Sequence, residues 1–208
     1  RLAMLSSHLV VALIALVVIG GATRVMEAGL ACPDWPLCYG SFLPGKQMNI
    51  QVFLEWFHRL DAFVIGIALI VQFICSLVWR KNLPFWLPYV YGFLVCLVAF
   101  QGLLGALTVI KLLSPIIVIS HLLVAFILVA ITSSLSQVLK NNNDEFSPLW
   151  WRIACSSMVG LLVIQSVIGS NVASHWSAQK CLAQSISCQI IHVHKTSAMI
   201  VGIAIFLF

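Results

Sequence analysis

The sequence is poor in charged residues. Of its 208 residues, 8% are charged and 62% are hydrophobic, whereas soluble globular domains carry about 25% charged residues. A water-soluble fold is therefore excluded, because too few polar side chains are available to cover its surface. The net charge of +5 does not indicate nucleic-acid binding either, since Lys and Arg lie at the ends of apolar segments.

What the sequence does contain is a series of long apolar segments. A membrane-spanning helix needs about 20 such residues, and strands of a barrel would be shorter and would alternate in polarity. Because lipid offers the backbone no hydrogen bonds, each segment is predicted to be helical. We therefore predict an all-α membrane protein with about six transmembrane helices, at residues 6–25, 52–79, 86–110, 115–138, 149–171 and 189–208.

The connections between these helices differ in charge on the two sides of the membrane. Arg1, Arg80–Lys81 and the connection 140–152 share one side, which the positive-inside rule assigns to the cytoplasm. Segments 26–51, 111–115 and 172–188 face the other side. The expected location is a bacterial plasma membrane, or the mitochondrial inner membrane if the source is eukaryotic.

The cysteines agree with this orientation. Cys32 and Cys38 share the first outer segment, and Cys181 and Cys188 share the last one. Two pairs on the outer side fit disulfides formed in an oxidising compartment. A membrane thiol oxidoreductase is disfavoured, because five residues separate Cys32 from Cys38 where such enzymes favour C-x-x-C.

Histidines lie at similar depths in the three even-numbered helices. His58 and His121 are about six residues from the outer ends of theirs, which is roughly 9 Å of depth, and the last helix carries His192 and His194. Ionisable residues at depth are costly and usually functional. Haem takes axial imidazoles from facing helices, whereas zinc needs clustered ligands. The alternative for each histidine is a hydrogen bond to a neighbouring helix.

Only one of the two neighbouring histidines can face the helix bundle, since residues two apart are about 200° apart around a helix. We choose His194 because a basic residue, Lys195, follows it. Arg59 likewise follows His58, and Arg24 ends the first span. These three cations are candidates for binding haem propionates, and their alternative role is to mark helix ends.

Glu55 precedes His58 by three residues, so the two share a helix face. A carboxylate beside a haem accepts a proton or stabilises developing positive charge. The other interpretation is an acid that favours the helix dipole at a helix start.

The sequence also contains an internal repeat. VIGGATR (Val18–Arg24) ends the first span and VIGSNV (Val167–Val172) ends the fifth, and each precedes an outer segment with two cysteines. A further similarity, between QGLLGALT (Gln101–Thr108) and QSVIGS (Gln165–Ser170), is interpreted as helix packing. The repeat predicts a four-helix half at 1–138 and an incomplete second half at 149–208. We expect two more helices beyond Phe208, so that the chain is a fragment.

Taken together, these motifs resemble the haem A synthase family. The resemblance rests on GGATRVMEAGLACPDWPLC (Gly20–Cys38), EWFHR (Glu55–Arg59), QGLLGALTV (Gln101–Val109), His121–Leu122 and the Cys181/Cys188 segment. It implies an eight-helix protein of two four-helix-bundle repeats, which oxidises the C8 methyl of haem O to a formyl group for cytochrome c oxidase biogenesis. Lys195 departs from the family, which usually has Arg at this place.

The resemblance implies a role for each candidate residue. His58 and His121 would hold the substrate haem O, and His194 would be one axial ligand of a haem b whose other ligand is missing here. Glu55 would be the essential carboxylate. The pair Cys32–Cys38 would form a disulfide with a debated redox role, and Cys181–Cys188 a structural one.

Two other classes of protein stay open. A di-haem electron carrier resembling cytochrome b needs the same histidines but neither Glu55 nor the cysteine segment. A transporter is suggested by the duplicated halves but places polar groups at the membrane midplane. Expected partners are haem O, haem O synthase, an electron acceptor and the lipid bilayer, with homo-oligomerisation left open and no nucleic acid.

Overall fold

The computed structural model describes residues 2–140, 148–173 and 186–207, and for 186–188 it describes the backbone alone. Within these residues, six helices are long and apolar enough to cross a membrane. They are α1 (Leu2–Val25), α2 (Ile50–Val78), α3 (Leu87–Ile110), α4 (Pro115–Lys140), α5 (Leu149–Val172) and α7 (Ile186–Leu207). The predicted all-α membrane fold with six spans is therefore confirmed, and the observed helices begin between four residues before and one residue after the predicted positions.

Local sequence explains where several helices begin. The Asn49 side chain caps α2 by accepting hydrogen bonds from the backbone N–H groups of Gln51 (3.0 Å) and Val52 (2.9 Å). Proline occupies the first helical position of α4 and one of the first two of α3, where its missing N–H costs nothing.

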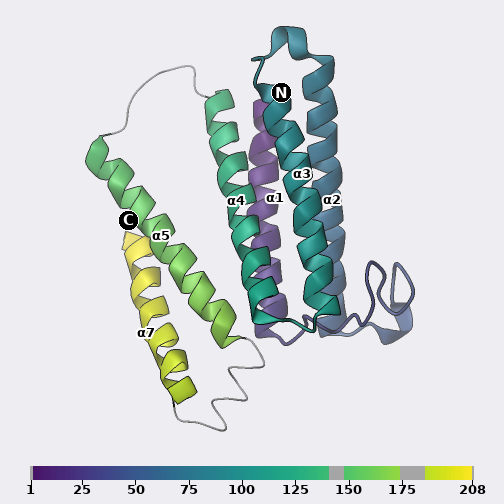
Figure 1. Ribbon diagram of the computed structural model, residues 1–208, viewed down its shortest axis with the longest axis vertical. Helices are drawn as coiled ribbons and strands as arrows, with labels where there is room; N and C mark the ends of the chain where they lie inside the picture. Colours follow the sequence, from purple (N-terminus) through teal and green to yellow (C-terminus); the bar gives the residue numbers. More distant parts are fainter. Residues whose placement is uncertain (1, 141–147, 174–185, 208) are drawn as a thin grey trace. The chain divides into compact units, whose positions relative to one another are not determined.

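The chain divides into two units, one of residues 1–113 with 120–142 and one of 114–119 with 143–208. The first unit holds α1, α2, α3 and most of α4, which run side by side (Figure 1). A hydrophobic core joins these four helices through Leu9, Leu13, Ile65, Leu69, Leu87, Tyr91, Leu94, Leu128 and Leu135. In the second unit, α5 packs against α7.

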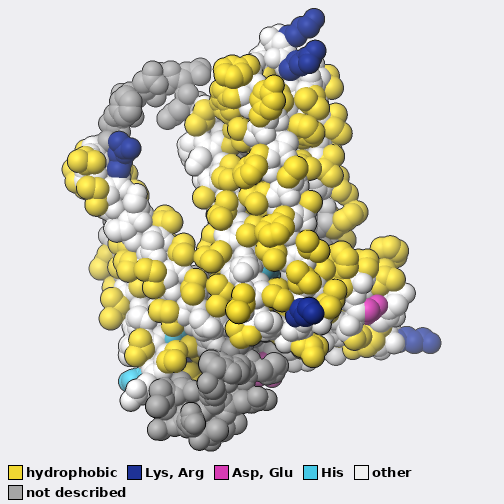
Figure 2. All heavy atoms as spheres, in the orientation of Figure 1, with side chains coloured by type: hydrophobic (Ala, Val, Ile, Leu, Met, Phe, Trp, Pro, Cys, Tyr) yellow, Lys and Arg dark blue, Asp and Glu magenta, His cyan; other side chains and the backbone are white. Residues whose placement is uncertain are grey.

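The outer surface of the helices is apolar. Figure 2 shows hydrophobic side chains along the flanks of the helices, while Lys and Arg side chains gather toward helix ends. Hydrophobic side chains such as Val11 and Phe63 are 67% and 66% exposed, which is tolerable only where lipid is the solvent. The chain is a multi-pass membrane protein.

A buried polar cluster lies in the half of the first unit that is remote from the histidines. The Ser6 hydroxyl on α1 is 2.8 Å from the Tyr91 hydroxyl on α3 and donates to Gln72 Oε1 on α2 at 3.4 Å. Ser7 and Ser136 pair at 2.8 Å, which ties α1 to α4. No local sequence pattern indicates this cluster. Its bonds join all four helices, and interhelical hydrogen bonds of this kind stabilise membrane bundles.

This cluster predicts an unequal response of two tyrosines to the loss of their hydroxyls. Tyr91→Phe removes the partner of Ser6, so the free energy of unfolding in detergent should fall by about 1 kcal/mol. Tyr89→Phe is the matched control, because Tyr89 is 77% exposed on the same helix and should change stability little. Equal effects of the two variants would contradict a stabilising role for the cluster.

Candidate functional site

Each of the three predicted ligand histidines packs against a glycine of the preceding helix. A Cβ atom built on each glycine would come within 2.8–3.3 Å of the Cε1 atom of the facing imidazole, closer than side chains normally approach. Glycine is therefore needed at these places to let the ring lie between the two helices. The pairs are Gly20–His58 (α1–α2), Gly105–His121 (α3–α4) and Gly169–His194 (α5–α7).

His58 and His121 occupy neighbouring positions within the first unit. They lie eight residues after Ile50 and six residues after Pro115, the first residues of their helices, which corresponds to depths of roughly 12 and 9 Å. Both rings are half-buried and close enough to each other to interact electrostatically. The Nδ1 atom of each ring is buried and has no hydrogen-bond partner among the described residues. Two imidazoles from separate helices are thus available at one level of the bundle.

The two histidines of α7 differ in their exposure. His192 is exposed, whereas His194 is half-buried against Gly169. His194 lies eight residues after Ile186, where α7 begins, so its depth matches that of His58. Lys195, the next residue, is exposed.

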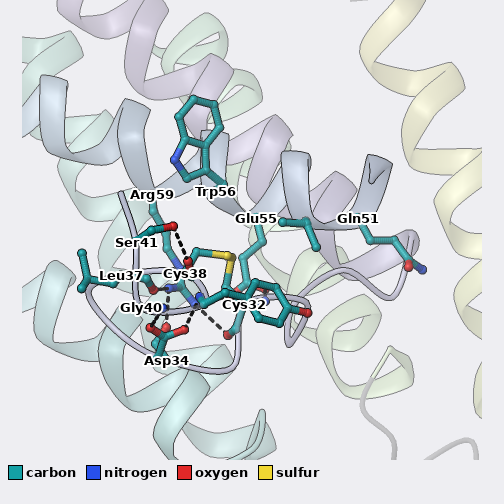
Figure 3. Close-up of a disulfide and its surroundings, with 12 residues drawn as sticks. Cys32, Asp34, Leu37, Cys38, Gly40, Ser41, Gln51, Glu55, Trp56 and Arg59 are labelled. Carbon is teal, nitrogen blue, oxygen red and sulfur yellow. Dashed lines mark hydrogen bonds and ion pairs between the residues drawn. A yellow bond between two sulfur atoms is a disulfide. The ribbon is translucent and has the colours of Figure 1, made fainter. Parts of the chain in front are cut away.

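The candidate catalytic residue Glu55 is held on both of its carboxylate oxygens (Figure 3). Its Oε2 accepts a 2.8 Å hydrogen bond from the backbone N–H of Cys32, and its Oε1 forms an ion pair with Arg59 one turn along α2. The side chain is 5% exposed. Glu55 therefore binds the cysteine loop directly.

Arg59 holds the same loop through backbone carbonyl groups. Its Nη1 atom donates to the carbonyl oxygens of Asp34 (2.6 Å) and Leu37 (2.8 Å), and its Nη2 donates to that of Cys32 (3.2 Å). A guanidinium has five N–H donors, and these contacts and Glu55 account for the four on its terminal nitrogens. The role of Arg59 in binding a haem propionate stays a prediction. The other candidates for that role are Arg24, in the last turn of α1, and Lys195.

The loop between α1 and α2 is closed by a disulfide. Cys32 and Cys38 are bonded with their Cα atoms 4.8 Å apart, and both are buried. The Trp56 ring N–H donates to the Phe42 carbonyl oxygen, a further contact between α2 and this loop. Side chains of the first turns of α2 therefore hold the loop in place. The second predicted disulfide, Cys181–Cys188, lies outside the residues whose side chains are described.

Asp34 shapes the turn that follows the disulfide. Its carboxylate accepts hydrogen bonds from the backbone N–H groups of Gly40 (2.8 Å) and Tyr39 (2.6 Å). The Gly40 bond is the largest of the effects that lower the pKa of Asp34 below its ordinary value. Both Tyr39 and Gly40 have positive φ angles, of 53° and 69°, so the carboxylate holds a backbone conformation that tyrosine rarely adopts.

Sequence reasoning missed two glutamines that contact the histidines. Gln101 on α3 and Gln165 on α5 each donate a 2.9 Å hydrogen bond to the backbone carbonyl oxygen of the facing histidine, His121 or His194. The signal was present in the similarity between QGLLG and QSVIG, where glutamine stands four residues before the glycine that faces the ring. From the sequence alone, that similarity is interpreted as helix packing.

Comparison with known proteins identifies related sequences over most of the chain. Residues 3–200 match the family COX15-CtaA, described as cytochrome oxidase assembly protein. A protein named heme A synthase from Shewanella oneidensis is 32% identical over 190 residues, which cover 82% of this chain and 56% of that protein. A protein of the same name from Bradyrhizobium sp. is 28% identical over 199 residues, covering 79% and 55%.

A shorter match is found with the heme A synthase of Bacillus pumilus, at 34% identity over 99 residues, 46% of this chain and 31% of that protein. The chain spans about half the length of the first two of these curated relatives. No solved structure matches the chain significantly.

The contact between Gly20 and His58 predicts opposite outcomes for two adjacent glycines. Gly20→Ala places a methyl group 2.9 Å from the imidazole, and overpacking of this kind costs about 1–3 kcal/mol. Gly21→Ala has nothing within 4 Å and should be neutral or slightly stabilising, because alanine is the better helix former. Thermal unfolding of the purified protein measures both, and a stable Gly20→Ala variant would disprove the tight fit.

The Asp34 turn predicts a pH dependence. Because folding lowers the pKa of Asp34, its ionised carboxylate stabilises the loop at pH values above the unfolded pKa of about 3.9. This stabilisation is lost as the pH falls through the lower, folded pKa. Hydrogen exchange of the Tyr39 and Gly40 amides should be slower in the wild type than in Asp34→Asn at neutral pH, and the difference should vanish in acid. A difference that persists in acid would refute this role.

Proposed function

Because the chain belongs to the COX15-CtaA family of cytochrome oxidase assembly proteins, we propose that it acts as a haem A synthase. The proposed reaction is the oxidation of the C8 methyl of haem O to a formyl group. The relatives named heme A synthase support this assignment. The observation that carries it here is the pair of half-buried imidazoles, His58 and His121, on separate helices of one unit.

These residues fit a haem group. A buried ring nitrogen without a partner costs about 1–3 kcal/mol, and the Nδ1 atoms of both His58 and His121 are in that state among the described residues. No group of three or more His, Cys, Asp or Glu residues in the described part of the chain is arranged to hold a metal ion. Single imidazoles on separate helices would instead be suited to hold a porphyrin iron.

We assign the residues as follows. His58 and His121 hold the substrate, haem O, and His194 is one ligand of a haem b cofactor. The substrate's methyl group supplies the electrons and protons that its conversion to a formyl group releases. An electron acceptor and an oxygen source are therefore required as partners of the protein.

Glu55 contributes a negative charge that is fixed in place. Both carboxylate oxygens are hydrogen-bonded, so the charge is preorganised near the helix face that carries His58, three residues further along α2. A fixed anion stabilises positive charge that develops on a substrate during oxidation. Arg59 and the Cys32–Cys38 loop hold Glu55 in this position.

The proposed location follows from charge and cysteine placement. Arg80 and Lys81 lie between α2 and α3, at the end of the helices remote from the disulfide loop. The positive-inside rule assigns that end to the cytoplasm, and a disulfide suits the opposite, oxidising side. The haem-binding histidines then face the outer side of a bacterial plasma membrane, in keeping with the bacterial relatives.

The test is extraction of pigments from the full protein after expression with a supply of haem O. A haem A synthase yields haem O and haem A, whereas a di-haem electron carrier yields haem b alone. Recovery of haem b alone from the wild-type protein would reject the proposed function.

Glu55→Gln is predicted to leave haem O bound and to lower haem A formation by about 100-fold or more, the usual cost of removing a preorganised electrostatic group. Extracted haem O and haem A are measured by chromatography. Glu27→Gln is the control, because it removes an exposed carboxylate of the same loop without touching the contacts of Glu55, and should still form haem A. Continued haem A formation in Glu55→Gln would show that Glu55 is not catalytic.

A further inference from the structure

Two of the three histidine sites share a second residue besides the glycine. Gln101 and Gln165 each lie four residues before the glycine that faces the ring, so the amide and the glycine are on the same face of their helix, one turn apart. Each imidazole therefore meets the neighbouring helix at two points, with the ring edge on glycine and a polar contact on glutamine.

The contact is most complete in the second unit. Gln165 Nε2 donates to the His194 carbonyl oxygen at 2.9 Å and lies 2.8 Å from His194 Nδ1. The Ser197 hydroxyl donates to Gln165 Oε1 at 2.9 Å. In this orientation the amide N–H points to Nδ1 and the neutral ring carries its proton on Nε2, whereas half a rotation of the amide lets its oxygen accept from Nδ1–H and leaves Nε2 for a ligand.

The first unit keeps the bond to the backbone carbonyl at His121, but its glutamine approaches the other ring nitrogen. Gln101 Nε2 donates to the His121 carbonyl oxygen at 2.9 Å and approaches the Nε2 atom of the ring at 3.4 Å. No serine takes the place of Ser197, because residue 124 is Val, and Gln101 Oε1 is buried without a partner. Gln101 therefore makes the same bond to the histidine carbonyl as Gln165 does, but its contact with the ring is longer.

The third site lacks the glutamine. Leu16 stands four residues before Gly20, where the other two helices have Gln. No side chain of the described residues hydrogen-bonds to the His58 ring. The three histidines thus share the glycine contact but differ in whether a side chain holds the imidazole.

We propose that Gln101 and Gln165 are positioning residues that fix the orientation of the His121 and His194 rings, and that His58 has no such residue. This inference rests on the proposed function in that these rings ligate haem iron. Groups that hydrogen-bond to a ligating histidine set the direction of the ring, and their loss weakens metal binding by about 10-fold to 100-fold. The substrate site then has one ring held by a side-chain amide and one, His58, held by packing and by the backbone of Leu16.

Gln165→Met tests the assignment with little change in side-chain volume. In the protein labelled with ¹⁵N-histidine and free of haem, the ring nitrogen resonances of His194 should shift, because both its Nδ1 contact and its anchored carbonyl are lost. In the haem-loaded protein, the electron paramagnetic resonance g values should shift and haem should be lost about 10-fold to 100-fold more readily. Gln101→Met should act in the same way on His121.

Gln72→Met is the matched control. Gln72 is a buried glutamine, 3% exposed, that bonds Ser6 in the remote polar cluster. Its substitution should lower stability without shifting either histidine. Leu16→Gln is the converse variant, which supplies the missing amide beside His58 and should shift the resonances of that ring.

The outcomes distinguish failure of the positioning role from failure of the proposed function. Unshifted His194 and His121 resonances in the glutamine variants would overturn the positioning role, whatever the protein binds. An equal shift in Gln72→Met would overturn it too, because the effect would then be a general loss of packing. A wild-type protein that binds no haem while its histidine resonances respond as expected would reject the proposed function and leave the Gln–His contacts supported.

Discussion

The close approach of a glycine to each histidine is the constraint on which the candidate site depends. An imidazole is too large to lie between two packed helices unless the facing residue has no side chain, and Gly20, Gly105 and Gly169 meet this need. The polar ring is thereby removed from lipid, where it would be costly. The same solution recurs in α1–α2, α3–α4 and α5–α7. The repeated element is thus visible at the level of a helix pair, a shorter period than the four-helix repeat that the sequence suggested.

A second constraint fixes the loop between α1 and α2 in the first unit. The disulfide Cys32–Cys38 closes the loop on itself, but Glu55 and Arg59 bind it to α2. These two residues are one helical turn apart, so a single face of α2 supplies both charges. The buried ion pair is matched by backbone N–H and carbonyl groups of the loop, and such hydrogen bonds are what make a buried pair tolerable.

Sequence reasoning reached the helices and the depth of the histidines because both depend on local patterns. Apolar length defines a span, and a residue's place within the span fixes its depth to within a turn. Contacts made across the bundle could not be predicted in this way. Gln101, Gln165 and Ser6 are polar residues whose partners are chosen by the packing of other helices. The sequence pointed to Arg59 as a haem-binding cation, and only the three-dimensional arrangement shows that the loop carbonyl groups engage it.

The geometry of Glu55 distinguishes between the two chemical roles that its sequence position suggested. Each carboxylate oxygen already accepts an N–H donor, from Cys32 or from Arg59, so a proton would have to use a remaining lone pair and would weaken these bonds. Stabilisation of positive charge requires no such change, because the anion is already held in place. The loop contacts therefore favour an electrostatic role over that of a base. They also mean that the loop cannot move away from α2 without releasing the carboxylate, which makes its position part of the site's chemistry.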